Sequence, residues 1–206
     1  MGIIKWFVKK VIVIIVILGI AVFFFQNQAV KLAVNLAVMS KTNARIKILN
    51  VDSKIQKGYI RLVGVTLLNP RGFKEPRLAE INSVLLKVDV LSLIKREIRV
   101  EKLFIDVNKI YIVKQKGEGT NFVSVKKTSS GSYKKNRTKK NNKILIQDLK
   151  IKISDVFYKD FRSNPPEMNR LHLGLMQEYS NITDFKKLFD LILTQNILKA
   201  VISNFQ

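Results

Sequence analysis

The stretch Leu67–Ile81, LLNPRGFKEPRLAEI, breaks a run of apolar residues with a polar corner and then returns to apolar alternation. In turns, the side chain of Asn69 can hydrogen-bond nearby backbone groups, and Pro70 has a fixed φ and no amide hydrogen for continued pairing. Gly72 can adopt a positive φ without steric strain. The stretch therefore predicts a structural corner that ends one strand and begins the next. We expect Phe73 to fold back as a plug at the rim of the apolar face.

Alternating apolar residues flank this corner. In VLLKVDV, Val84, Leu86 and Val88 alternate with other side chains, and successive side chains of a strand point to opposite faces. These three residues are therefore expected to share one apolar face. The same period predicts long sequential strands near residues 45–55, 58–69, 79–90, 97–107 and 109–115, with a turn at 91–97. Such strands favour a β-meander over residues 44–115.

The start of the chain predicts a membrane anchor. Val11–Phe25 is uncharged and apolar, and the apolar residues 6–8 bring the stretch near the roughly 20 residues that a membrane span needs. A cleaved signal peptide also has a basic start, but no small-residue cleavage site follows Phe25, which favours an uncleaved signal anchor over residues 1–28. A helix over residues 29–43 is expected to carry the chain off the membrane. Basic residues on both sides of the apolar core lean toward a cytoplasmic amino terminus without deciding it.

The chain is strongly basic, with 37 Lys and Arg residues against 15 Asp and Glu residues and a formal net charge of +22. This balance is typical of proteins whose partners are nucleic acid or anionic lipid, although a lysine-rich overall composition is an alternative explanation. Residues 116–143 are expected to form a flexible exposed loop. We expect its basic side chains to contact anionic headgroups: Lys126, Lys127, Lys134, Lys135, Arg137, Lys139, Lys140 and Lys143.

The remaining sequence predicts further strands and a final helix. Residues 144–180 alternate again in ILIQDLKIKISDVFYKDF and in the shorter RLHLGL. Over residues 181–206 the apolar residues follow a helical period, with Thr183 as a helix cap. The apolar stripe of this helix would include Phe185, Leu188 and Ile192.

The order of these parts resembles the AsmA-like family of bacterial envelope proteins, specifically its short members. Three motifs carry the resemblance: the corner Asn69, Pro70, Gly72, Phe73; the turn Asp89, Leu91, Ser92, Leu93; and the strand Ile98, Val100, Leu103, Ile105, Asp106. Ile182, Thr183 and Leu188 are similar to the family's final helix, whereas Val90 and Asn108 depart from its pattern. The resemblance implies a sheet curled into an open trough, related to bridge-like lipid transfer proteins whose apolar inner face carries acyl chains. It also implies a single-pass protein of the bacterial inner membrane with its body in the periplasm.

The predicted fold class is therefore mainly β with helices at both ends. It comprises an N-terminal transmembrane helix, a long-stranded antiparallel meander curled into an open trough, and a C-terminal amphipathic helix. No constellation in the sequence predicts catalysis or a bound cofactor. The chain has no cysteine, and its single histidine, His172, has no second metal ligand nearby in sequence. The G-x-G of KGEGTNF is not expected to precede a helix, and the aspartates are scattered, so we expect a non-enzyme.

Three functional interpretations follow. In the first, the trough binds or helps to transfer lipid acyl chains in envelope biogenesis. In the second, the C-terminal helix closes the trough and the protein is a structural subunit that contacts other envelope proteins. About six strands at roughly 4.8 Å span only about 29 Å, too little to bridge an envelope alone, which gives this second interpretation weight. The third, a nucleic-acid binder, is disfavoured because the basic loop has one aromatic residue, Tyr133, and no stacking platform.

Overall fold

The computed structural model describes residues 25–183 except positions 41, 96, 118 and 127–142. The predicted anchor core, Val11–Phe25, lies outside these residues except for Phe25, and so does the stripe of the predicted C-terminal helix. Within the described part of the chain, no helix has the length and apolar character that a membrane span requires.

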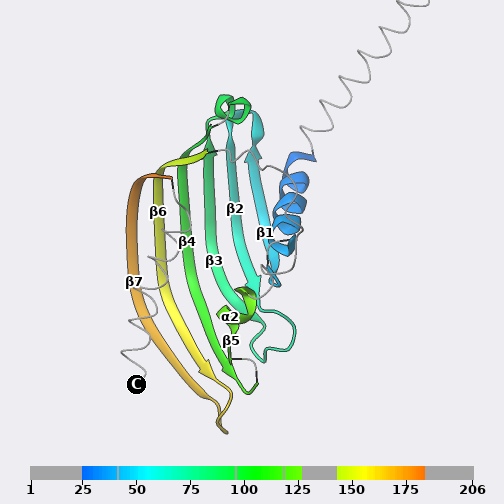
Figure 1. Ribbon diagram of the computed structural model, residues 1–206, viewed down its shortest axis with the longest axis vertical. Coiled ribbons are helices and arrows are strands. Elements are labelled where there is room, and N and C mark those ends of the chain that lie inside the picture. Colours follow the sequence, from blue (N-terminus) through cyan, green and yellow to red (C-terminus); the bar gives the residue numbers. More distant parts are fainter. Residues whose placement is uncertain (1–24, 41, 96, 118, 127–142, 184–206) are drawn as a thin grey trace, which may run out of the picture.

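The described residues form one open sheet of seven strands, and the long strands curve together along their length (Figure 1). The order across the sheet is β1-β2-β3-β4-β6-β7, and the short β5 pairs with β4 alone. The strands are β1 Arg45–Lys54, β2 Tyr59–Leu68, β3 Arg77–Val88, β4 Glu97–Gln115, β5 Gly119–Thr120, β6 Lys143–Asp160 and β7 Glu167–Ile182. Short 3-10 helices, η1 (Ile55–Lys57) and η2 (Val90–Ile94), join β1 to β2 and β3 to β4, and the helix α2 (Asn121–Lys126) follows β5.

The predicted mainly β architecture is correct, but a simple antiparallel meander describes only β1 to β4. β6 runs parallel to β4, with Glu97 opposite Lys143 and Lys114 opposite Asp160. A parallel neighbour requires a crossover. The chain must therefore pass from one end of the sheet to the other between α2 and β6.

Several predicted boundaries also change. The two strands expected at 97–107 and 109–115 are one 19-residue strand, β4. The pairing between β3 and β4 skips Asn108, so a local irregularity absorbs this residue and the strand continues. β7 has 16 residues and reaches Ile182, so the C-terminal helix does not begin at residue 181.

A helix over residues 25–40 lies beside β1 (Figure 1). Its described part already includes residues 25–28, before the predicted 29–43. The helix ends before Thr42, whose hydroxyl donates to the Val38 carbonyl at 2.8 Å. Val30 is buried against Ile48, Val51 and Leu62 of the sheet. The helix thus covers one face of the sheet over β1 and β2.

The sheet has two ends, which we name for what lies there. The anchor end holds the amino-terminal part of the described 25–40 helix, η1, η2 and the first residues of β4 and β6. The corner end holds residues 69–76, the β4–β5 turn, α2 and the turn between β6 and β7. Side chains of Gln26 and Asn27 hold the amino-terminal part of the described helix at the anchor end. Asn27 Oδ1 accepts from the amide of Ser53 at 2.9 Å and from its hydroxyl at 2.6 Å.

Candidate functional site

The candidate site is the apolar face of the sheet, which the strand register assembles from rows of aliphatic side chains. Val84 pairs with Ile105 of β4, which pairs with Ile151 of β6. The next two rows likewise place one aliphatic side chain on each of these three strands. Those rows are Leu86–Leu103–Leu149 and Val88–Val100–Ile146. The structure therefore places the predicted trough residues Val84, Leu86 and Val88 side by side on one face.

Burial is uneven across this face. Over β6 the side chains are almost fully buried, with Ile146 and Leu149 each 2% exposed and Val156 0% exposed. Over β3, by contrast, Val84, Leu86 and Val88 are only half-buried. Their β4 neighbours Leu103 and Ile105 are also half-buried. These side chains and Ile81 define what we call the apolar strip: Ile81, Val84, Leu86, Val88, Leu103 and Ile105.

Described elements bound the apolar strip on two sides. The 25–40 helix covers the neighbouring β1 and β2 through Val30 and Val34. At the corner end, Phe122 of α2 packs against the same apolar cluster. The strip thus runs along β3 from a closed corner end toward the anchor end.

Phe73 does not lie at the rim of this face. It packs with Tyr111, Val113 and Phe157, whereas the alternating residues Ile110 and Ile112 belong to the apolar face. Neighbouring side chains in a strand point to opposite faces, so Phe73 covers the opposite face of the sheet. The prediction was wrong because the direction in which the corner folds is set by tertiary packing rather than by the local turn residues.

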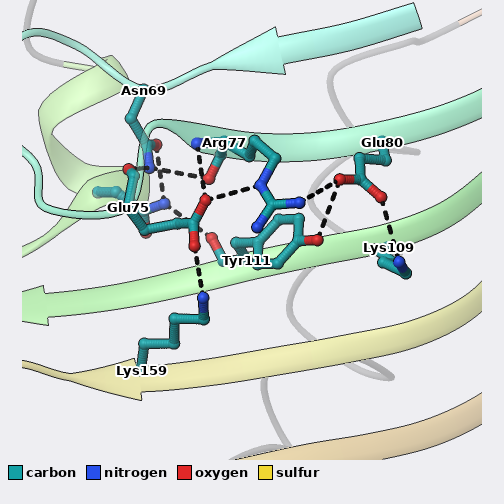
Figure 2. A network of polar contacts seen from close by, with 8 residues as sticks. Asn69, Glu75, Arg77, Glu80, Lys109, Tyr111 and Lys159 are labelled. Carbon is teal, nitrogen blue, oxygen red and sulfur yellow. Dashed lines mark hydrogen bonds and ion pairs between the residues drawn. The ribbon is translucent and has the colours of Figure 1, made fainter. Parts of the chain in front are cut away.

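The corner is instead held by a polar network on that second face (Figure 2). The Glu75 carboxylate is 5% exposed and accepts hydrogen bonds from the amide and the Nε of Arg77 at 3.1 and 2.8 Å. Lys159 of β6 also donates to this carboxylate. Arg77 Nη1 also donates to Glu80 Oε1 at 2.8 Å, and the Tyr111 hydroxyl donates to the same oxygen at 3.1 Å. The network therefore ties the corner to β3, β4 and β6.

Opposing effects set the pKa of Glu75. Burial would raise the pKa, but the hydrogen bonds from Arg77 and Lys159 outweigh it, and the pKa lies below its ordinary 4.5. The pKa of Glu80 is lowered in the same way by Arg77 and Tyr111 against the effect of burial. Burial, followed by the charge of Glu80, raises the pKa of Tyr111 to about 12. Both carboxylates are thus held ionised and paired. Such pairing stabilises the corner against the strands that it contacts.

Asn69 and Gly72 occupy the corner as their residue types suggest. The Asn69 amide donates to the carbonyls of Glu75 and Arg77 at 2.8 and 3.0 Å, which closes the loop on itself. Gly72 has a φ of 108°, a backbone conformation that residues other than glycine rarely adopt. Pro70 follows the last residue of β2 by two positions and cannot supply an amide for pairing.

Most of the predicted anionic-surface residues lie outside the described residues. These are Lys127, Lys134, Lys135, Arg137, Lys139 and Lys140. Lys126 ends α2 and Lys143 begins β6, so residues 116–143 are not one continuous loop. A helix does follow the G-x-G, contrary to expectation, but α2 has only 6 residues.

His172 is 73% exposed and pairs with one carboxylate: its Nδ1 lies 2.9 Å from Asp155 Oδ1. Arg170 contacts the other oxygen of Asp155 at 2.9 Å. Across the described ranges, no group of three or more His, Cys, Asp or Glu side chains is placed to hold a metal ion. Arg170 and His172, both on β7, thus engage the two oxygens of Asp155.

These observations define one class of architecture. It is an open, curved sheet with an apolar face and a helix along its first edge. Comparison with protein families, with curated proteins and with solved structures gives no match. The resemblance to the AsmA-like family therefore stays a prediction carried by its sequence motifs.

Proposed function

We propose that this protein is a membrane-anchored envelope protein whose apolar strip binds lipid acyl chains or helps to transfer them. The observation that carries the proposal is the row of half-buried aliphatic side chains along β3 and the first half of β4. When an apolar ligand covers the exposed part of these aliphatic side chains, the burial favours binding by about 25 cal/mol for each Å² removed from water.

The dimensions of the apolar strip support an acyl chain as the ligand. At about 3.4 Å per residue, β3 extends about 24 Å from Ile81 to Val88. One leaflet of a bilayer has about 15 Å of hydrocarbon, half of the roughly 30 Å core. An acyl chain that leaves a leaflet could therefore lie on the strip along its full length.

The proposed location follows from the sequence. The apolar run Val11–Phe25 would hold the protein in the inner membrane as a single-pass anchor, and the family resemblance favours a body in the periplasm. Carbonate extraction of membranes and protease treatment of spheroplasts test these two points. Release by carbonate contradicts the anchor, and protection of the body before lysis contradicts the periplasmic location.

A second function is favoured by the nearly complete burial over β6. Ile146, Leu149, Ile153 and Val156 are 0–3% exposed, as expected of a closed core rather than of a ligand site. In that alternative the face is sealed, for example by the apolar stripe of Phe185, Leu188 and Ile192, and the protein acts as a structural subunit.

Photocrosslinking separates the two functions. The full-length protein is reconstituted with a phospholipid that carries a photoreactive acyl chain, and crosslinked peptides are mapped after digestion. Crosslinks on β3 and β4 support acyl-chain binding. Crosslinks confined to residues 6–25 would show only lipids around the anchor and would favour the sealed structural subunit.

A further inference from the structure

Large apolar side chains are exposed together at the anchor end. In η2, Leu91 is 68%, Leu93 55% and Ile94 86% exposed. Ile55 of η1 is 44% exposed and Ile144 at the start of β6 is 47% exposed. Soluble proteins expose single apolar residues often, but a group at one end of a sheet marks an interaction surface.

η2 turns its one polar residue, Ser92, inward and three of its four apolar residues outward. Ser92 is 1% exposed; its hydroxyl donates to the Asp89 carbonyl at 2.5 Å and accepts from the Arg99 amide at 2.9 Å. The Asp89 carboxylate accepts from the Leu91 amide at 3.0 Å. The loop is thus fixed by its own polar groups, and the exposure of Leu91, Leu93 and Ile94 is built into it.

The same end of the sheet receives the chain from the predicted anchor. The described part of the 25–40 helix reaches this end, where Asn27 accepts hydrogen bonds from Ser53, and Phe25, its first described residue, is 64% exposed. In the sequence, the apolar run that begins at Val11 ends at Phe25. Figure 1 shows η2 and the amino-terminal end of the described helix at the same end of the sheet.

The charges around this surface suit anionic headgroups. Lys54, Lys57 and Lys95 are exposed beside η1 and η2. The nearby acids Asp89 and Glu97 are engaged, the first in the loop itself and the second 3.6 Å from Arg99. Apolar side chains with a basic border are typical of protein surfaces that lie in the boundary between headgroups and acyl chains.

We propose that η2, together with Ile55, inserts into the interface of the membrane that carries the anchor. Leu91, Leu93 and Ile94 then lie in the boundary between headgroups and acyl chains. Because Val88 precedes η2 by two residues, the apolar strip opens directly onto the bilayer. The inference rests on the membrane anchor of the proposed function and is independent of acyl-chain binding to the strip.

The absence of native cysteine permits a direct test with single labels. Full-length Ile94→Cys and Leu93→Cys proteins are labelled with the environment-sensitive dye NBD and reconstituted into vesicles of zwitterionic and anionic phospholipid. Two positions serve as references: Val16→Cys in the predicted anchor, and Ser163→Cys, which is exposed at the corner end. Quenching by nitroxide-labelled lipid and by aqueous iodide is then measured. We expect the labels at 93 and 94 to be quenched by the lipid nitroxide and protected from iodide, and the label at 163 to behave in the opposite way.

The other outcomes each overturn the inference in a distinguishable way. If the label at 16 is quenched by lipid while those at 93 and 94 are quenched by iodide, the anchor holds and the insertion of η2 is wrong. If the label at 16 is not quenched by lipid, the membrane anchor itself fails. If the labels at 93 and 94 are protected from both quenchers, another protein or a second copy covers η2, and membrane insertion is again wrong.

Discussion

The side-chain amide of Asn121 donates a 2.9 Å hydrogen bond to the side-chain oxygen of Asn69, 52 positions earlier in the chain. Both residues are buried, with exposures of 0% and 2%. Asn121 also donates to the Tyr111 carbonyl at 2.8 Å and accepts from the Val113 amide at 3.0 Å. This pair therefore joins the β2–β3 corner to the end of β4 and to the start of α2.

Loss of either asparagine should destabilise the protein. Asn69→Ala and Asn121→Ala each leave buried backbone or amide groups without partners, which costs about 1–3 kcal/mol. Because the two side chains share a hydrogen bond, the double variant should lose less than the sum of the single variants, with a coupling of about 0.5–3 kcal/mol. Urea unfolding of the four proteins measures the cycle. Asn82→Ala, at an exposed site, is the control and should change stability little; additive losses in the buried pair would contradict a direct coupling.

Acid should destabilise the corner network. The lowered pKa of Glu75 means that its contribution to the free energy of unfolding is present above its ordinary pKa of 4.5 and is lost as the pH falls through the lower pKa of the folded state. We therefore expect the Tm to fall with decreasing pH below about 4.5, and Glu75→Gln to flatten this fall while lowering the Tm at neutral pH. Glu101→Gln, in the exposed pair with Lys87, is the control. An unchanged acid profile in Glu75→Gln would contradict the assigned role.

Gly58 and Gly117 form a matched pair for a test of close packing. Both have positive φ, 63° and 81°. A Cβ at Gly58 would lie 1.9 Å from the Val88 carbonyl oxygen, whereas a Cβ at Gly117 would meet nothing within 4 Å. Gly117→Ala should therefore cost only the backbone strain, about 1 kcal/mol, and Gly58→Ala clearly more. Equal losses in thermal unfolding would show that the end of β3 does not pack against Gly58 as described.

The basic segment around Lys127–Lys140 should be sensitive to lipid charge. Each basic residue near an anionic surface contributes about 1 kcal/mol, and salt screens the attraction. We expect trypsin to cleave this segment more slowly in full-length protein held in anionic nanodiscs than in zwitterionic nanodiscs. High salt should remove the difference. Equal cleavage rates at low salt would contradict contact with anionic headgroups.

The sequence predicts much of the sheet because apolar residues alternate along large parts of its strands. The aliphatic side of β3 follows directly from Val84, Leu86 and Val88, and the turn predicted at 91–97 overlaps η2, Val90–Ile94. The full length of β7 was not predicted: only the short strand RLHLGL was expected, because the exposed Met176 and the half-buried Gln177 break the apolar alternation that would mark the rest of the strand.

Other features depend on contacts between distant residues. No local pattern shows that β6 pairs in parallel with β4, because the alternation of a strand is the same in either direction. The placement of Phe73 depends on Tyr111 and Phe157, and the burial of Glu75 depends on Lys159, which lies 84 positions away. In the sequence, a single Glu before a proline does not predict that its carboxylate will be buried and paired.

The central claim, that the apolar strip holds acyl chains, is tested most directly by the lipid bound to two neighbouring variants. Leu86→Arg places a charge in the strip, where a charge without a partner is costly to bury. Leu85→Arg is the matched control, because its side chain lies on the opposite face of the same strand. Lipid that co-purifies with each full-length protein is extracted and quantified by mass spectrometry, and the Tm is measured in parallel. We predict that Leu86→Arg loses bound lipid with its fold intact, whereas Leu85→Arg retains the lipid of the unchanged protein. Equal lipid in both variants, together with a large drop in Tm for Leu86→Arg alone, would contradict the claim and identify a sealed core.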